Sequence, residues 1–234
     1  MLQQINDRFN SACETCADKS CAIKTLREYE LQLWRNNYHE VKFRKGDMIM
    51  SEGISVNQIA YLRRGLVKEY GTIDHFQQYI LQVIKPHSYL GLESIFDNCI
   101  NKYSYVALSD VTVCFLKLPV FLELIKENGQ FSYEILSSIC NNNLRNYHRF
   151  IIQHQKNSRG KLADVLLYFS NVIFESLCFI LPLTRKEIAY MVGISRESVS
   201  KQLCGFEMDQ IVKIRRREIT ILDVNKLEQI SRLG

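Results

Sequence analysis

The sequence lacks a long apolar run. Its most apolar stretch, from Leu162 to Leu183, is interrupted by residues that include Asp164, Glu175 and Pro182, so it falls short of the roughly 20 apolar residues that a membrane span requires. We therefore interpret it as core.

Disorder, a collagen-like fibre and a small disulfide-bonded scaffold are also excluded, because 234 residues with 47% hydrophobic and 24% charged content can form one large or two modest globular domains.

Signatures of catalysis are absent as well. The sequence contains no phosphate-binding glycine loop, no nucleophile elbow and no paired histidines spaced for a metal site. Cys13 and Cys16 form a C-x-x-C pair, but a thioredoxin-like dithiol requires a βαβ unit, and the pattern predicts none. We expect no enzyme, and a dithiol redox protein is only a remote alternative.

The N-terminus lacks the apolar segment of a secretory signal, since Asp7 and Arg8 stand where that segment would lie. We therefore expect a cytoplasmic protein. The eight cysteines are then expected to be reduced thiols or metal ligands and not disulfides. Three of them, Cys140, Cys178 and Cys204, are expected to lie on apolar helix faces in the core.

The excess of positive charge is small. A formal net charge of +5 does not by itself identify a nucleic-acid-binding protein. Its distribution says more, because eight basic and four acidic residues lie between Arg185 and Arg217. Most of the excess therefore belongs to one short C-terminal segment.

Residues 41–118 show short alternating runs broken by turn residues. Apolar runs such as 48–50, 59–61, 105–108 and 111–118 are separated by turns such as Lys45-Gly46-Asp47 and Arg64-Gly65. Short strands at regular spacing with glycine at the corners are typical of an antiparallel β-roll or jelly roll.

After Pro119 the pattern becomes helical. Residues 131–156 contain no glycine or proline, and one face carries residues at alternating spacings of four and three, which is the seam of a coiled coil. We expect this face to form a homodimer, with Asn143 fixing the register; packing on the chain's own β-roll is the alternative. The predicted dimerisation residues are Leu136, Cys140, Asn143, Tyr147, Phe150 and His154.

The segment from Leu183 to Phe206 predicts a helix-turn-helix. Thr184 followed by Glu187 is a capping box that begins a helix. Gly193 supplies a left-handed residue that ends it, and Ser195 caps the next helix. Two helices joined by a turn of about three residues form this motif.

The second of these helices has a polar outer face. Val199, Leu203 and Phe206 lie on one side at helical spacing and are expected in the core. Arginine, glutamate, serine and lysine side chains read base edges in the DNA major groove, although on an isolated helix they would be merely solvated. The predicted DNA-reading face contains Arg196, Glu197, Ser200 and Lys201.

A basic hairpin follows. Residues 211–214 and 219–222 alternate as two strands, and Arg215, Arg216 and Arg217 lie between them. Such a wing contacts phosphates and adds salt-dependent affinity without sequence preference. With Thr184 and Ser195, these residues complete the predicted DNA-binding set.

The whole chain resembles the Crp/Fnr family of transcription regulators. The segment Gly193-Ile194-Ser195-Arg196-Glu197-Ser198-Val199-Ser200-Lys201-Gln202-Leu203 is similar to the family's recognition segment at each position, except that Lys201 stands where the family usually has arginine. The lysine keeps the charge but loses the bidentate fork.

The resemblance implies an α+β fold with a cyclic-nucleotide-binding-like jelly roll, a dimerisation helix and a winged helix-turn-helix. It also implies a homodimer on a palindromic, TGA-containing operator of double-stranded DNA, and RNA polymerase as a partner.

Family members that bind cyclic AMP carry a Gly-Glu and an Arg-Ser or Arg-Thr about ten residues later. The matching stretches here read Gly91-Leu92-Glu93 and Asn101-Lys102-Tyr103-Ser104. Without the bidentate arginine, capture of a cyclic phosphate is poorly supported, and we do not expect cyclic AMP to bind.

The N-terminal cysteines suggest a different signal. Cys13, Cys16 and Cys21 cluster in a way that soft-metal chemistry favours. They resemble the cysteines of the family's oxygen-sensing branch, the fumarate and nitrate reductase regulators, although the third spacing is one residue shorter here. The resemblance implies a [4Fe-4S] cluster held by these three residues and a β-roll cysteine, for which Cys114 matches best and Cys99 is the reserve.

Other interpretations stay open at this stage. The cysteines could instead form a structural zinc site or be free thiols, with a small molecule as effector. A β-roll that binds a ligand or a protein, with the helical part serving only for interaction, is a third class. We expect four regions: a cysteine-rich extension at 1–22, a β-roll sensor domain at 23–129, a dimerisation helix at 130–158 and a DNA-binding domain at 159–234.

Overall fold

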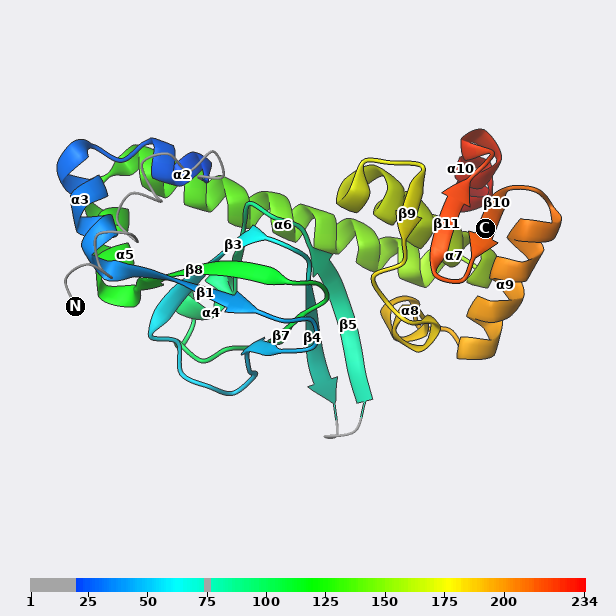
Figure 1. Ribbon diagram of the computed structural model, residues 1–234, viewed down its shortest axis with the longest axis horizontal. Coiled ribbons are helices and arrows are strands. Elements are labelled where there is room, and N and C mark those ends of the chain that lie inside the picture. The colour runs from blue at the N-terminus through cyan, green and yellow to red at the C-terminus, as the bar shows by residue number, and fades with distance from the viewer. Residues whose placement is uncertain (1–19, 74–76) are drawn as a thin grey trace. The chain divides into compact units, whose positions relative to one another are not determined.

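The fold combines an antiparallel β-roll, a long helix and a second, mostly helical part (Figure 1). The computed structural model describes residues 20–73 and 77–234. No helix in these ranges is long and apolar enough to cross a membrane. The helices are α2 (Cys21–Lys24), α3 (Glu28–Asn37), α4 (Leu92–Phe96), α5 (Leu118–Glu127), α6 (Gly129–Gln155), α7 (Ser158–Tyr168), the π-helix η1 (Phe169–Phe174), α8 (Arg185–Val192), α9 (Arg196–Met208) and α10 (Val224–Leu233). The strands are β1 (Tyr38–Phe43), β2 (Met48–Met50), β3 (Gln58–Arg64), β4 (Val67–Ile73), β5 (Gln77–Ile84), β6 (Ser88–Leu90), β7 (Ser104–Ala107), β8 (Val111–Lys117), β9 (Cys178–Ile180), β10 (Val212–Arg215) and β11 (Glu218–Ile221).

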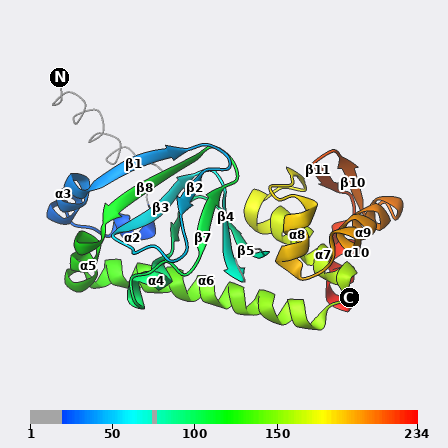
Figure 2. The ribbon, with the colours of Figure 1, turned by 90° about the horizontal axis from the view of Figure 1, so that it is seen from below.

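Two four-stranded sheets form the β-roll, which confirms the predicted fold class (Figure 2). One sheet has the order β1-β8-β3-β6 and the other β2-β7-β4-β5. Alternation along β3 directs Ala60 and Leu62 into the roll and Ile59 to the opposite face. The sequence pattern missed β4 because it contains Lys68 and Glu69, two charged residues that are nevertheless buried.

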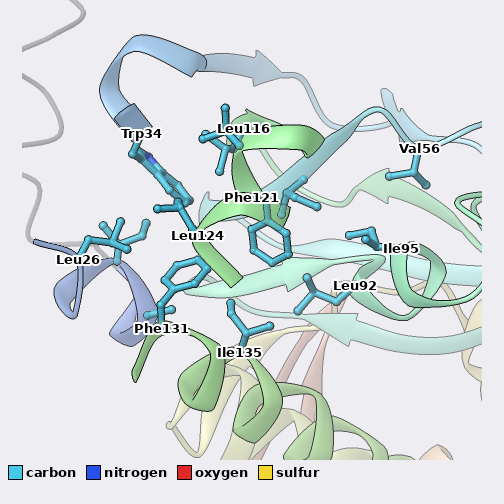
Figure 3. Close-up of a cluster of buried hydrophobic side chains, with 14 residues drawn as sticks. Leu26, Trp34, Val56, Leu92, Ile95, Leu116, Phe121, Leu124, Phe131 and Ile135 are labelled. Carbon is cyan, nitrogen blue, oxygen red and sulfur yellow. The ribbon is translucent and has the colours of Figure 1, made fainter. Parts of the chain in front are cut away.

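The outer face of the β1-β8-β3-β6 sheet is covered by helices. A cluster of buried side chains fills the space between this sheet and α2, α3, α5 and the beginning of α6 (Figure 3). Phe131 is fully buried there, with its ring centroid 6.5 Å from that of Trp34 and 5.7 Å from that of Phe121. The beginning of α6 is therefore part of the β-roll core.

A buried polar link joins α3 to α6. The Asn128 amide donates to Glu30 Oε2 at 2.8 Å, and its Oδ1 accepts from the Phe131 N–H at 2.9 Å. Burial raises the pKa of Glu30, but hydrogen bonds from the Arg27 N–H and from Asn128 outweigh it, so the pKa lies below its ordinary value. Glu30 is therefore an anion held by aligned donors.

The chain divides into two compact units. One contains the chain up to Glu69 with Ile84–Asn143, and the other contains Tyr70–Val83 with Leu144–Gly234. Within the second, the Tyr168 hydroxyl donates to the Val83 carbonyl at 2.6 Å, and the Arg149 guanidinium lies 5.6 Å from the Tyr168 ring centroid. Strand β5, the end of α6 and α7 therefore meet at one side chain.

The connection between α6 and α7 is short, because only residues 156 and 157 separate the two helices. Asn157 caps α7, and Gly160 lies inside that helix. A Cβ at Gly160 would come within 2.8 Å of the Gly234 backbone. This glycine therefore permits a close approach of α10 and does not supply a flexible joint.

Candidate functional site

The helix-turn-helix forms as the sequence predicts. The Thr184 hydroxyl accepts from the Glu187 N–H, and Glu187 accepts from the Thr184 N–H, so the capping box of α8 is complete. Gly193 is left-handed with φ 66°, and Ser195 Oγ accepts from the Ser198 N–H at 3.0 Å. The turn between α8 and α9 thus comprises residues 193–195.

The two faces of α9 differ as expected. Val199, Leu203 and Phe206 are buried. Arg196, Glu197 and Lys201 are exposed and Ser200 is half-buried. These four residues lie on the outer side of the helix, near its N-terminal end.

Sequence reasoning missed Arg185. Its Nη1 donates to Ser200 Oγ at 3.2 Å, so a cation from α8 lies beside the outer face of α9. Its position one residue after the Thr184 cap was the available signal, because the first turn of α8 crosses α9 in this motif.

The wing is a three-stranded sheet of order β10-β11-β9. Arg215 and Arg216 are exposed at its turn, and Arg216 has a left-handed φ of 58°. Arg217 points elsewhere: its Nη2 donates to the carbonyls of Leu181 at 2.9 Å and Pro182 at 3.2 Å. The guanidinium of Arg217 therefore braces the wing against the segment before α8.

The predicted seam on α6 is uncovered in the single chain. Leu136, Tyr147 and Phe150 are 59%, 66% and 61% exposed. Cys140 is exposed and Asn143 half-buried. The side chain of His154 lies outside the described residues. A row of large apolar side chains on one helix face is costly in water.

Cys114 lies on the helix-covered face of the β1-β8-β3-β6 sheet, and α2, which begins at Cys21, packs on that face. The Ser20 and Tyr89 hydroxyls share a hydrogen bond of 2.7 Å, and Cys21 follows as the first residue of α2. Tyr89 pairs with Tyr61 across β6 and β3, and Tyr61 pairs with Cys114 across β3 and β8. Paired residues share a face, so Ser20 contacts the same face of the sheet as Cys114, two strands away from it.

The other cysteines predicted as metal ligands are not brought together by the described part of the structure. Cys13 and Cys16 lie outside the described residues. Cys99 follows α4, with its thiol donating to the Ile95 carbonyl at 3.4 Å. Within residues 20–73 and 77–234, no three histidine, cysteine or acidic side chains are grouped as a metal site.

The expectation that three other cysteines are core thiols is wrong. Cys140, Cys178 and Cys204 are all exposed. Cys178 lies on strand β9 and not on a helix, with its thiol 3.3 Å from Glu218 Oε1. Cys140 lies on the uncovered seam of α6, and Cys204 lies outside the buried row of α9.

The β-roll position where a cyclic phosphate would lie is acidic. A Cβ at Gly91 would be 3.6 Å from the Tyr105 hydroxyl, which donates to buried Glu69 at 2.8 Å. Burial, followed by the Glu69 carboxylate, raises the pKa of Tyr105 well above its ordinary value. Lys102 is paired with Asp97 at 2.6 Å. Residues 91–104 contain no arginine and their single lysine is paired, so this stretch offers a cyclic phosphate no bidentate partner.

Comparison with known proteins matches both parts of the chain. Residues 40–128 match the cyclic nucleotide-binding domain model, and residues 160–230 match the Crp-like helix-turn-helix domain model. The anaerobic regulatory protein of Haemophilus influenzae is 23% identical over 94% of this chain and 87% of that protein. The fumarate and nitrate reduction regulatory protein of Vibrio cholerae is 23% identical over 94% of this chain and 90% of that protein.

Solved structures show the same fold. FixK2 from Bradyrhizobium japonicum superposes with a TM-score of 0.77 at 18% identity, covering 84% of this chain and 98% of that one. A regulator of the Crp/Fnr family from Eubacterium rectale has a TM-score of 0.72 at 18% identity, covering 89% and 96%. With its β-roll, its capped helix-turn-helix and both domain matches, the chain belongs to the Crp/Fnr family of DNA-binding transcription regulators, which are not enzymes.

Proposed function

We propose that the protein is a homodimer that reads a palindromic, TGA-containing operator with α9 and responds to oxygen or redox state through its cysteines. The observation that carries the DNA-reading part is the outer face of α9. Arg196, Glu197 and Lys201 are exposed near the capped N-terminal end of α9, and buried residues hold the opposite face. Side chains at this end of a recognition helix reach base edges in the major groove.

The residues of the interface divide into two roles. Glu197 and Lys201 read bases, because a carboxylate accepts from the cytosine amino group and an ammonium donates to guanine. Arg216, at the exposed turn of the wing, contacts phosphate. Arg217 contributes less to DNA binding, because its guanidinium already donates to two carbonyls.

Gel-shift titration at several salt concentrations tests these roles. Glu197→Ala should lower the preference for the operator over unrelated DNA, by about 1–3 kcal/mol. Arg216→Gly preserves the left-handed turn, and should weaken binding to all DNA alike with a smaller salt slope. Glu228→Ala and Arg232→Ala are matched controls, since both positions lie on α10 away from the proposed face. Indifference of the operator preference to Glu197→Ala would refute the reading face.

The dimer rests on the uncovered seam of α6. Two copies of this face would bury Leu136, Tyr147 and Phe150 against each other, and Asn143 would pair across the seam. Phe150→Glu should give a monomer in sedimentation velocity. Ile54→Glu is the control, because Ile54 is similarly exposed, at 60% against 61%, but lies in the β-roll. A Phe150→Glu protein that stays dimeric contradicts the seam.

Redox sensing is supported by the packing of α2, which begins at Cys21, on the sheet face that carries Cys114. It is also supported by the names of the relatives, which are anaerobic and fumarate and nitrate reduction regulators. Thiolates are the ligands that iron-sulfur clusters prefer. Cys13, Cys16, Cys21 and Cys114 would hold a [4Fe-4S] cluster, which supplies an oxygen-reactive centre when bound. The chain's own residues present Cys21 over the sheet through the Ser20–Tyr89 hydrogen bond.

Anaerobic purification followed by iron, sulfide and zinc analysis tests this assignment. We expect iron and sulfide in equal amounts, loss of both in Cys114→Ser, and retention in Cys99→Ser. Zinc without sulfide would favour a structural zinc site with a separate small-molecule effector. A protein free of metal would refute both. We also propose, from the family resemblance, that the regulator contacts RNA polymerase and acts in the cytoplasm.

A further inference from the structure

The connection between α6 and α7 is stiff. Asn157 Oδ1 accepts from the N–H groups of Arg159 at 2.9 Å and Gly160 at 3.1 Å. Lys156 Nζ lies 2.7 Å from Asp164 Oδ2. The Asp164 carboxylate also accepts from the Ser231 hydroxyl of α10. Lys156 and Asn157, which follow α6, are therefore fixed to α7.

Arg159 extends from this turn to the recognition helix. Its Nη2 lies 2.5 Å from Asp209 Oδ2, and its guanidinium carbon lies 5.1 Å from the Phe206 ring centroid. One side chain thus makes an ion pair and a cation–π contact with the same end of α9. Both partners lie in the compact unit that contains Arg159.

A cation is favourable at the C-terminal end of α9, because negative charge gathers there. Asp209 is the C-cap of α9, and the last turn of the helix contains no basic residue. An anion at the negative end of a helix dipole is unfavourable. Arg159, from another helix, compensates both the carboxylate and the dipole.

The ion pair is too exposed to contribute mainly to stability. The side chains of Arg159 and Asp209 are 37% and 44% exposed, and exposed pairs contribute little to folding. The two contacts do, however, demand a particular side chain, because a guanidinium can stack its plane on Phe206 while its fork meets a carboxylate. Lysine cannot make both contacts at once.

We propose that Arg159 is a positioning residue for DNA recognition, which sets the orientation of α9 through Asp209 and Phe206 without contacting DNA. This inference rests on the proposed reading face. Arg196 and Glu197 begin the 13-residue helix and Asp209 follows it, so Arg159 acts about 18 Å from Glu197 along the helix axis. It therefore couples the joint after α6 to the angle at which the reading face meets the groove.

Binding assays on the full-length protein test the inference. The probes are a duplex that the wild-type protein selects from a randomised pool, and an unrelated duplex of equal length. Arg159→Lys should weaken binding to the selected duplex about tenfold, within the range of coupled residues. Binding to the unrelated duplex, the salt slope and the melting temperature should remain at wild-type values. Asp209→Asn should reproduce the loss, and the double variant should be no worse than either single variant.

Three outcomes would overturn the inference. The first is wild-type affinity of Arg159→Lys for the selected duplex. The second is equal weakening on both duplexes in Arg159→Ala with a salt slope smaller by about 0.9, which marks a direct phosphate contact. The third is additive loss in the double variant. Glu197→Ala, measured in parallel, separates the two proposals: if it keeps the wild-type preference while Arg159→Lys loses it, Glu197 does not read bases, and Arg159 still positions α9.

Discussion

The helix-turn-helix and the junction of α3 with α6 depend on different kinds of hydrogen bond. In the DNA-binding unit, polar side chains cap helices within three residues of themselves, as Thr184 does for α8 and Ser195 for α9. Asp223 caps α10 in the same way. Each cap forms as soon as its own helix does, so the shape of the helix-turn-helix is encoded locally.

In the β-roll unit, two side-chain bonds join distant parts of the chain. Asn128 and Glu30 are 98 residues apart, and Ser20 and Tyr89 are 69 apart. These bonds form only when the helices pack on the sheet. Glu30 therefore ties α3 directly to the beginning of α6, whereas each helix of the recognition motif holds its own first turn through its own cap.

Removing the centre of the β-roll core should have the largest effect. Phe131→Ala deletes a fully buried ring between Trp34 and Phe121. We expect the free energy of unfolding of this unit to fall by about 3–5 kcal/mol. Urea titration monitored by the fluorescence of Trp34, the chain's single tryptophan, measures it. Phe96→Ala, at a 53% exposed ring, is the control; a loss under about 1 kcal/mol for Phe131→Ala would contradict the core assignment.

The long-range link through Glu30 should give an intermediate, pH-dependent effect. Because its pKa in the folded protein is lowered from the ordinary value of 4.5, the carboxylate contributes stability above that value, which is lost as the pH falls through the folded pKa. Asn128→Ala should cost about 1–3 kcal/mol at neutral pH. In the wild-type protein the urea midpoint should fall as the pH is lowered below about 4.5. In Glu30→Gln this acid-induced fall, here called the acid limb, should be smaller. Glu28→Gln, on the exposed face of α3, should retain the limb; an unchanged limb in Glu30→Gln would exclude this residue as its source.

A local cap should give the smallest effect. Thr184→Ala should cost about 1 kcal/mol, because one α8 amide loses its acceptor. Hydrogen exchange should quicken in the first turn of α8 and remain unchanged in α9, whose own cap is intact. Thr184→Ser keeps the hydroxyl and serves as the control. Faster exchange throughout both helices would mean that the motif is not encoded locally.

The same distinction decides what could be predicted from the sequence. The capping box, Gly193 and the buried row of α9 were all predictable, because spacing along the chain determines them. Strand β4 was not, since Lys68 and Glu69 are polar and their burial depends on partners elsewhere. The exposure of Cys178 was missed because its segment was interpreted as a helix, and short apolar runs do not distinguish strands from helices.

The site followed the same rule. Arg196, Glu197 and Lys201 were placed on an outer face from helical periodicity alone. Arg217 was expected at the phosphates with its neighbours, and only the folded structure shows its guanidinium on the carbonyls of Leu181 and Pro182. Arg159 carried no sequence signal, because its partners lie 47 and 50 positions further along.

The hydrogen bond from Tyr168 to Val83 has a consequence for how regulators of this kind can diverge. Its acceptor is a main-chain carbonyl, which every amino acid at position 83 provides. Tyr168 therefore senses the position of strand β5 and not its side chains. Substitutions can therefore accumulate along β5 while its attachment to α7 stays unchanged.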